Sequence, residues 1–228
     1  MAIYEALQAT KNRITAACVS AGRPPDAVQL LTVSKTFPAA AVREAFAAGA
    51  RAFGENYVQE GLAKIDELGD LRSELEWHLI GPLQSNKTRP VAEQFDWVHS
   101  VDRLKVAQRL SEQRPAHLPP LNICLQVNIS AETSKSGLMP DEVAPLAAQV
   151  ALLPGLRLRG LMAVPEPGPG ALAQHQAMAA LYTSLQSRGL ALDTLSLGMS
   201  ADLEDAIAAG STMVRVGSAI FGARGAKA

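Results

Sequence analysis

Eight short apolar runs, rich in β-branched residues, alternate with Ala-rich helical stretches along nearly the whole chain. This alternation is typical of parallel strands joined by crossover helices. The runs cover residues 29–35, 52–56, 76–81, 97–101, 122–129, 156–164, 194–199 and 212–217. Eight such units in 228 residues predict a compact (β/α)8 TIM barrel, an α/β fold with a single domain over residues 1–228.

The segments between the runs are predicted to be helices. Candidates cover 38–48, 102–113, 141–151, 171–188 and 202–209, and glycines that often end helices follow three of them, at Gly49, Gly189 and Gly210. The alternative architecture is a doubly wound open sheet. The chain lacks a GxGxxG turn after the first predicted strand, so the barrel is the better interpretation.

An extra helix is predicted before the first strand. Ile3, Leu7, Ile14 and Cys18, with Ala6 and Ala17, recur at three- and four-residue spacings, which indicates an amphipathic helix. Only residues 218–228 follow the last predicted strand, and they are short for a full closing helix. We therefore expect the N-terminal helix to fill in around the barrel.

Composition excludes several kinds of partner. Lys and Arg number 21 against 22 Asp and Glu, and no basic run could lie along a phosphate backbone or an anionic membrane. Cys18 and Cys124 form no CxxC or zinc-type spacing. Charges interrupt the start of the chain where a signal peptide would be apolar, and no apolar run is long enough for a membrane span. We expect a reduced, cytoplasmic protein with no nucleic-acid or membrane partner.

Lys35 is the sharpest functional candidate. It ends the first run, and strand alternation places it on one face with Leu31 and Val33, at the mouth of the predicted barrel. Desolvation there would lower an ammonium pKa, and a neutral amine can attack an aldehyde to form a Schiff base. The alternative is a structural lysine that reaches solvent or pairs with Glu55.

The last two strands predict an anion site. Ser200 follows the seventh run in a Gly-Met-Ser turn, and Asp202 could cap the helix after it. Gly217 and Ser218 follow the eighth run, where backbone N–H groups can be presented without a side chain in the way. The loops after strands seven and eight commonly bind phosphate in these barrels. The alternative is that these residues only turn the chain and cap a helix.

Arg215 lies on the same face of the eighth run as Met213 and Gly217, so its guanidinium is predicted to enter the barrel. Since it cannot lose its proton there, it needs a fixed acceptor or an anion. A ligand and a structural ion pair with an acid such as Glu55 are equally good interpretations.

The histidines favour structure over metal binding. His78 and His99 end the third and fourth runs and could converge, but no third ligand accompanies them. Core histidines satisfied by their neighbours are the better interpretation. His117 and His175 are expected to be exposed to solvent.

Several longer strings fall in a fixed order along residues 28–224: VSKTFP, FGENYVQE, WHLIGPLQSNK, SVDR, VNIS, SKSGL, GLMAV, LSLGMSADLEDAI and VRVGSAIFGAR. Together they resemble the pyridoxal phosphate homeostasis protein family. The resemblance implies a barrel similar to the N-terminal domain of alanine racemase, with pyridoxal 5'-phosphate (PLP) as cofactor. It also implies a role in intracellular PLP (vitamin B6) and amino-acid homeostasis.

The resemblance carries roles to particular residues. Lys35 in VSKTFP corresponds to the lysine that forms the Schiff base with PLP, and Arg215 is similar to the arginine that faces the pyridine nitrogen. The cofactor-binding residues expected from the resemblance are Lys35, Asn56, Met162, Ser200, Arg215, Gly217 and Ser218, of which Ser200, Gly217 and Ser218 would hold the phosphate.

Strong catalysis is not expected. A racemase needs a second base opposite the lysine. In alanine racemase that base is a tyrosine from a separate domain, and none of Tyr4, Tyr57 and Tyr182 matches it. An arginine at the ring nitrogen would also keep that nitrogen unprotonated and weaken the ring as an electron sink. We therefore expect a non-catalytic PLP-binding protein, without catalytic or metal-binding residues.

Two other functions stay open at this stage. One is a weak PLP-dependent amino-acid racemase or lyase. The other is a PLP-free sugar-phosphate isomerase or aldolase in which Lys35 attacks a substrate carbonyl.

Lys135, in the loop after the fifth run, is a rival amine, and the loop at 163–170 could be a partly mobile lid. PLP-dependent apoenzymes are candidate recipients of PLP, and we expect a monomer or a weak dimer.

Overall fold

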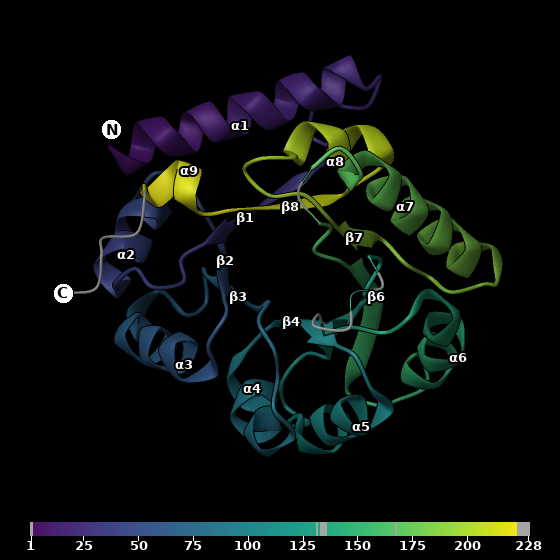
Figure 1. Cartoon of the computed structure of the whole chain (residues 1–228). Helices are drawn as coiled ribbons and strands as arrows, with labels where there is room; N and C mark the ends of the chain where they lie inside the picture. The colour runs from purple at the N-terminus through teal and green to yellow at the C-terminus, as the bar shows by residue number, and fades with distance from the viewer. Residues whose placement is uncertain (1, 131, 133–135, 167, 223–228) are drawn as a thin grey trace.

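The computed structural model describes residues 2–130, 132, 136–166 and 168–222, and it confirms the predicted (β/α)8 barrel (Figure 1). Eight parallel strands close in sequence order, with β8 pairing back to β1. The strands are β1 Gln29–Val33, β2 Ala52–Glu55, β3 Glu76–Leu79, β4 Trp97–Val101, β5 Leu121–Gln126, β6 Leu156–Met162, β7 Thr194–Ser196 and β8 Met213–Val216. Most are shorter than their predicted runs, because the last residues of the run lie beyond the sheet at the mouth of the barrel.

Helices surround the barrel on the outside (Figure 1). They are α1 Ile3–Ser20, α2 Ala39–Ala47, α3 Val58–Glu67, α4 Thr88–Gln94, α5 Leu104–Gln113, α6 Pro140–Val150, α7 Ala171–Ser187, α8 Leu203–Ala209 and α9 Ser218–Phe221, with short 3-10 turns η1 Gly69–Leu71 and η2 Ser85–Lys87. Gly49, Gly189 and Gly210 have φ of 97°, 89° and 115°. These left-handed glycines stop α2, α7 and α8 as predicted.

The N-terminal helix α1 closes the ring of helices where the chain ends. It packs against α8 and α9, and Figure 1 shows it lying across these two helices. Its buried residues include Leu7, Ile14 and Cys18, as the spacing predicts. The helix α9 is only four residues long, so α1 covers the adjoining part of the barrel.

The barrel interior is only partly aliphatic. One apolar cluster contains Leu31, Ala52 and Met213, and another contains Trp97, Cys124 and Met162. The interior also holds buried polar side chains, among them His78, His99, Ser196 and Arg215. Such barrels are usually filled by branched aliphatic residues, so this polar content needs an explanation. Among the described residues, no helix has the length and apolar character needed to span a membrane.

Candidate functional site

A cavity of about 580 Å³ lies at the C-terminal ends of the strands. It is lined by Val33, Lys35, Phe37, Ile80, Met199, Ser200, Ala201, Arg215, Gly217, Ser218 and Gly222. Five predicted site residues therefore meet in one place: Lys35, Ser200, Arg215, Gly217 and Ser218. The volume lies within the usual range for small-molecule sites.

Lys35 lies in a turn just beyond the end of β1, and it is half-buried. The alternation predicted for this strand is confirmed, because Leu31 enters the barrel interior while Val33 and Lys35 line the cavity. The next residue, Thr36, has a φ of 69°, which is unusual for a β-branched residue. Its backbone N–H donates to the carboxylate of Glu60, so α3 holds this strained turn in place.

A buried ion cluster supports the lysine turn from the side of α3. Lys64 Nζ donates to Glu55 at 2.7 Å, to Glu60 at 2.8 Å and to the Ser34 carbonyl at 2.8 Å. The Ser34 hydroxyl also donates to Glu55 at 2.6 Å. Burial raises the pKa of Glu55, although the charge and hydrogen bond of Lys64 act in the opposite direction. The cluster fixes the residues on both sides of Lys35.

Sequence reasoning missed Lys64 and Glu60. The clue was available, since Glu55 ends an otherwise apolar strand and a buried carboxylate requires a cation. Lys64 stands nine residues later, and Glu60 and Lys64 are four apart on one helix. Glu55 is thus bonded to Lys64 and Ser34, and not to Arg215 as one alternative had it.

Two serine hydroxyls converge on the cavity from the last two turns. The Ser200 and Ser218 Oγ atoms are 3.5 Å apart, although the residues belong to turns after different strands. Gly217 lies against β1, since a Cβ atom there would come within 2.8 Å of the Val33 carbonyl oxygen. Only glycine lets the turn pass this close to the strand that precedes Lys35. The two hydroxyls could together bind an anionic group.

The turn that carries Ser200 is held by side chains from three elements. Met199 N–H donates to Asp202 Oδ1 at 2.7 Å, and His175 Nε2 of α7 lies 3.0 Å from Asp202 Oδ2. Arg13 of α1 donates to the Ser200 carbonyl at 2.8 Å and pairs with Glu204. Burial opposes ionisation of Asp202, but His175 and the Met199 N–H outweigh it and lower its pKa.

Two expectations about this turn were wrong. Asp202 occupies the N-cap position of α8, but its carboxylate accepts the Met199 N–H instead of capping the helix. His175 was expected to be exposed and is completely buried, because Asp202 supplies a partner from a distant part of the sequence. His117, by contrast, is exposed as expected.

Arg215 is 4% exposed, and its described partners are all neutral. It donates to the Ser196 carbonyl at 2.7 Å, to Ser196 Oγ at 2.8 Å and to the Ala163 carbonyl at 2.8 Å. Burial lowers its pKa to about 10. The predicted alternative of an ion pair with Glu55 is therefore wrong, and a positive charge without a direct carboxylate partner in the described structure borders the cavity.

His78 and His99 converge, but on each other. His78 Nδ1 lies 2.9 Å from His99 Nε2, and both rings are completely buried. This confirms that both are core histidines, although His78 Nε2 has no hydrogen-bond partner among the described residues. Within the described part of the chain, no group of three or more His, Cys, Asp or Glu residues could hold a metal ion.

Other predicted residues are not brought to the cavity lining. Met162 is 1% exposed and packs with Trp97 and Cys124 inside the barrel, and Asn56 is half-buried just after β2. Neither is among the lining residues that the structure describes. Their contact with a ligand stays a prediction. Lys135, the rival amine, lies outside the described residues, as does part of the 163–170 loop.

Comparison with known proteins adds a family context to this geometry. Residues 5–225 match the family model of the alanine racemase N-terminal domain. A pyridoxal phosphate homeostasis protein of Pseudomonas aeruginosa is 63% identical over 222 residues, with 97% of this chain and 96% of the relative covered. The protein of the same name from Escherichia coli K12 is 57% identical, with 96% and 95% covered.

A solved structure shows the same fold at substantial identity. PipY of Synechococcus elongatus PCC7942, determined with PLP bound, has a TM-score of 0.80 and 41% sequence identity to this chain. The match covers 92% of this chain and 100% of PipY.

Proposed function

The chain belongs to the pyridoxal phosphate homeostasis protein family, and from that premise we propose that it binds PLP in the cavity at the mouth of its barrel and takes part in keeping the supply of PLP balanced. The relatives bear this function in their names, and PipY was solved with PLP. The proposal extends to amino-acid homeostasis, which the resemblance implies.

One observation carries the proposal. The cavity brings together an amine, two convergent hydroxyls and a buried guanidinium, from Lys35, Ser200 with Ser218, and Arg215. These groups match the aldehyde, the phosphate and the pyridine nitrogen of PLP, respectively. A ligand with only one of these chemical features would match only one of these three kinds of protein group.

Each group has a distinct role in the proposal. PLP supplies an aldehyde and an electron-accepting ring when it is bound. Lys35 would hold the aldehyde carbon as a Schiff base, while the hydroxyls of Ser200 and Ser218 and the turn at Gly217 hold the phosphate. Arg215 would face the ring nitrogen. Asn56 and Met162 would lie along the ring.

We propose that the protein does not catalyse strongly. Arg215 already carries a positive charge at the ring-nitrogen end, so a protonated ring nitrogen beside it is unfavourable. Lys35 is the one base among the described lining residues, whereas racemisation needs a base on each face of the substrate. The names of the relatives agree with a homeostatic role. A weak racemase or lyase activity is the alternative, and hydrogen–deuterium exchange at the α-carbon of amino acids would reveal it.

We also propose that the protein functions in the cytoplasm. Cys18 and Cys124 are buried free thiols, which suits a reducing cytoplasm. We propose PLP-dependent apoenzymes as recipients of the cofactor, and a single-domain protein that is a monomer or a weak dimer.

The test is the absorbance of the protein after incubation with PLP. We expect a visible band that borohydride abolishes, with the reduced adduct on the Lys35 peptide by mass spectrometry. Lys35→Ala should lack the band, whereas Lys105→Ala, on the exposed side of α5, should keep it. An adduct on Lys135, or an unchanged band in Lys35→Ala, would refute the assigned amine, and absence of any band would refute the function.

A further inference from the structure

An arginine of the N-terminal helix is bonded to the turn that carries Ser200. Arg13 Nη1 donates to the Ser200 carbonyl at 2.8 Å. The Nε and Nη2 atoms of the same side chain donate to the two carboxylate oxygens of Glu204, in the first turn of α8. Hydrogen bonding to Arg13 lowers the pKa of Glu204, so this carboxylate is ionised at neutral pH. One planar guanidinium therefore binds a carboxylate and a backbone carbonyl at the same time.

The bond to the Ser200 carbonyl sets the direction of the next N–H group. No cis peptide bond occurs among the described residues, so the Ser200 carbonyl and the Ala201 N–H point to opposite sides of one planar peptide unit. The carbonyl points toward Arg13 on α1, which lies outside the ring of strands (Figure 1). The Ala201 N–H therefore points away from α1, and Ala201 is one of the residues that line the cavity.

The Ala201 N–H has no hydrogen-bond acceptor within the part of the chain that the structure describes. The hydroxyls of Ser200 and Ser218 lie in the same part of the cavity lining, with their Oγ atoms 3.5 Å apart. A backbone N–H beside two hydroxyls can donate to the same anion. The turn thus offers an anionic ligand a third donor that residue types alone do not reveal.

Arg13 is the one described donor to the Ser200 carbonyl. Asp202 also holds this turn, but it does so through the Met199 N–H, which belongs to an earlier peptide unit. Without Arg13, the peptide between Ser200 and Ala201 would lose the bond that fixes its rotation. Its N–H would then no longer be held toward the cavity.

We propose that Arg13 is a positioning residue that selects for phosphorylated ligands, because it turns the Ala201 N–H toward the phosphate. The identification of this anion as the phosphate of PLP rests on the proposed function. Arg13 is not among the residues that line the cavity, so it acts on the ligand through the peptide that it holds.

The competing explanation is that Arg13 only fastens α1 to α8. Arg23 provides a control for this role, because its Nη1 donates to the carbonyls of Ile207 and Ser211 at 2.7 Å each, at the other end of α8. Removing the Arg23 side chain therefore loosens the same pair of segments without touching Ser200.

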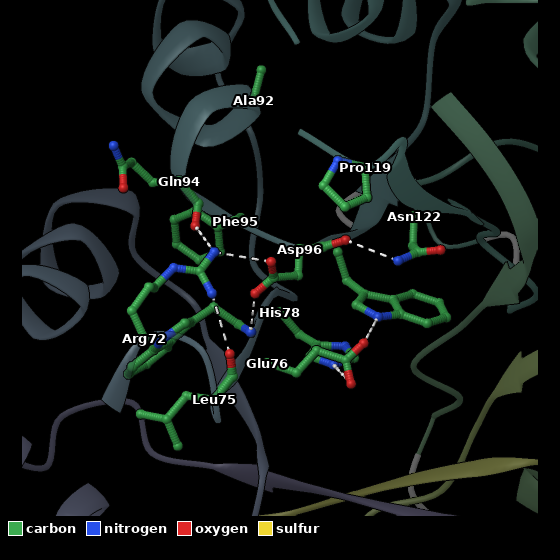
Figure 2. Close-up of polar contacts among 12 residues, drawn as sticks. Arg72, Leu75, Glu76, His78, Ala92, Gln94, Phe95, Asp96, Pro119 and Asn122 are labelled. Atoms are coloured by element: carbon green, nitrogen blue, oxygen red, sulfur yellow. Dashed lines mark hydrogen bonds and ion pairs between the residues drawn. The ribbon is translucent and has the colours of Figure 1, made fainter. Parts of the chain in front are cut away.

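Arg72 provides a second control, with the same pair of bonds at the opposite end of the barrel. It donates to the Gln94 carbonyl and to the Asp96 carboxylate at 2.9 Å each, as Figure 2 shows. Its side chain is 35% exposed, against 39% for Arg13. The two arginines thus match in exposure and in the kinds of bond that they make, and they differ in their distance from the cavity.

Inorganic phosphate tests the Ala201 N–H without the cofactor. In PLP-free wild-type protein, saturating phosphate should shift the backbone amide resonance of Ala201 in proton–nitrogen NMR spectra. Arg13→Met should show a much smaller shift, whereas Arg23→Met and Arg72→Met should keep the wild-type shift. An unmoved Ala201 resonance in the wild type, or an equal shift in Arg13→Met, would overturn the proposal.

Affinities for PLP and for pyridoxal, which carries a hydroxyl in place of the phosphate, separate selection of the phosphate from folding. Titration of the visible band should show PLP binding about tenfold weaker in Arg13→Met, near the lower limit for one hydrogen bond to a charged group. Pyridoxal binding should be unchanged in Arg13→Met, and both control variants should bind both ligands as the wild type does.

Equal PLP affinity in Arg13→Met and wild type would overturn the proposal. A loss of affinity for pyridoxal as large as that for PLP would also overturn it, since the role of Arg13 would then be structural. If the wild-type protein gives no band with PLP, the proposed function fails, while the phosphate spectra still decide whether Arg13 positions the Ala201 N–H.

Discussion

At the scale of single residues, each buried charge in this barrel requires a partner of opposite charge or a hydrogen-bonding group beside it. Glu55 is 0% exposed and Lys64 is 5% exposed, and together they fix the turn of the candidate Schiff-base lysine. Breaking a buried pair is costly because one charge is left without its partner. The pair is therefore a structural requirement of the site, although neither side chain is among the residues lining the cavity.

Lys64→Met is expected to lower the free energy of unfolding by about 3–5 kcal/mol at neutral pH, the usual cost of a broken buried ion pair. Burial already raises the pKa of Glu55, so the loss should shrink toward acid pH, where Glu55 takes up a proton. Urea unfolding at several pH values measures both effects. Lys105→Met, an exposed control on α5, should change stability by less than about 0.5 kcal/mol. Equal losses in the two variants would contradict the assigned pair.

His99 predicts a pH dependence of stability. Its pKa is depressed in the folded protein, so its contribution is present above the unfolded pKa of about 6.5 and is lost as the pH falls below that value. One such proton changes the free energy of unfolding by at most about 1.4 kcal/mol per pH unit. His99→Asn should show a shallower decline than wild type between about pH 6.5 and 5, and His117→Asn should not. Identical slopes in all three proteins would rule out this role of His99.

Ser200 predicts a local effect on the ligand. Ser200→Ala would remove the proposed hydrogen bond to the charged phosphate and should weaken PLP binding by about 2 kcal/mol, roughly thirtyfold. Titration of the visible band measures the affinity. Ser187→Ala, on the exposed surface of α7, is the control. Unchanged affinity in Ser200→Ala would place the phosphate elsewhere.

At the scale of elements, the two strands that close the barrel also build the cavity. The register pairs Leu31 with Arg215 and Thr32 with Val216, so the turns after β1 and β8 leave the sheet side by side. Gly217 fits between them because it lacks a Cβ atom. The site therefore depends on close packing of backbone as much as on side-chain chemistry.

Gly217→Ala is expected to lower the free energy of unfolding by about 1–3 kcal/mol, as overpacking commonly does, and to reduce PLP binding. The added methyl carbon would meet the Val33 carbonyl oxygen at 2.8 Å, and backbone cannot rotate away. Gly69→Ala is the matched control, since no heavy atom outside the adjoining backbone lies within 4 Å of the place its methyl carbon would take. Thermal unfolding and PLP titration of both variants check this. A harmless Gly217→Ala would show that the contact can relax.

Patterns local in sequence predicted most of these elements. Eight strands, the extra N-terminal helix and the face of Leu31, Val33 and Lys35 all follow from periodicity, and the structure confirms them. Periodicity did not predict where β1 stops. That end depends on the positive φ of Thr36 and its bond to Glu60, a residue of another element.

The same reason explains the errors at the site. The partner of His175 is Asp202, and the partners of Arg215 lie on β7 and just after β6. No local spacing encodes such pairs, because they arise only when the barrel closes. Residue types predicted that a lysine and an anion site were plausible, whereas the family resemblance supplied the cofactor.

At the scale of the whole molecule, the barrel is held together by its ends. The N-terminal helix α1 packs on the last two helices, and Arg13 reaches from it to the carbonyl of Ser200. A ligand in the cavity would contact turns from opposite ends of the chain. Binding should therefore stabilise the complete barrel and not one segment of it.

PLP is expected to raise the unfolding free energy of the whole protein. At a free concentration of about one hundred times Kd, binding to the folded state alone adds about 2.7 kcal/mol. Calorimetry with and without PLP measures the gain as a higher melting temperature. Lys35→Ala at the same PLP concentration should gain less, because the covalent contribution is lost. An equal gain in both proteins would mean that Lys35 does not hold the ligand.

The closure of the barrel by β1 and β8 also has a consequence for biosynthesis. Lys35 leaves the ribosome long before Arg215 and Ser218, because they belong to opposite ends of the barrel sequence. A nascent chain therefore exposes the proposed Schiff-base lysine well before the proposed phosphate-binding turns have formed. If the cavity is the PLP site, the amine and the phosphate-binding turns can therefore act together only after translation has passed Ser218 and β8 has paired with β1.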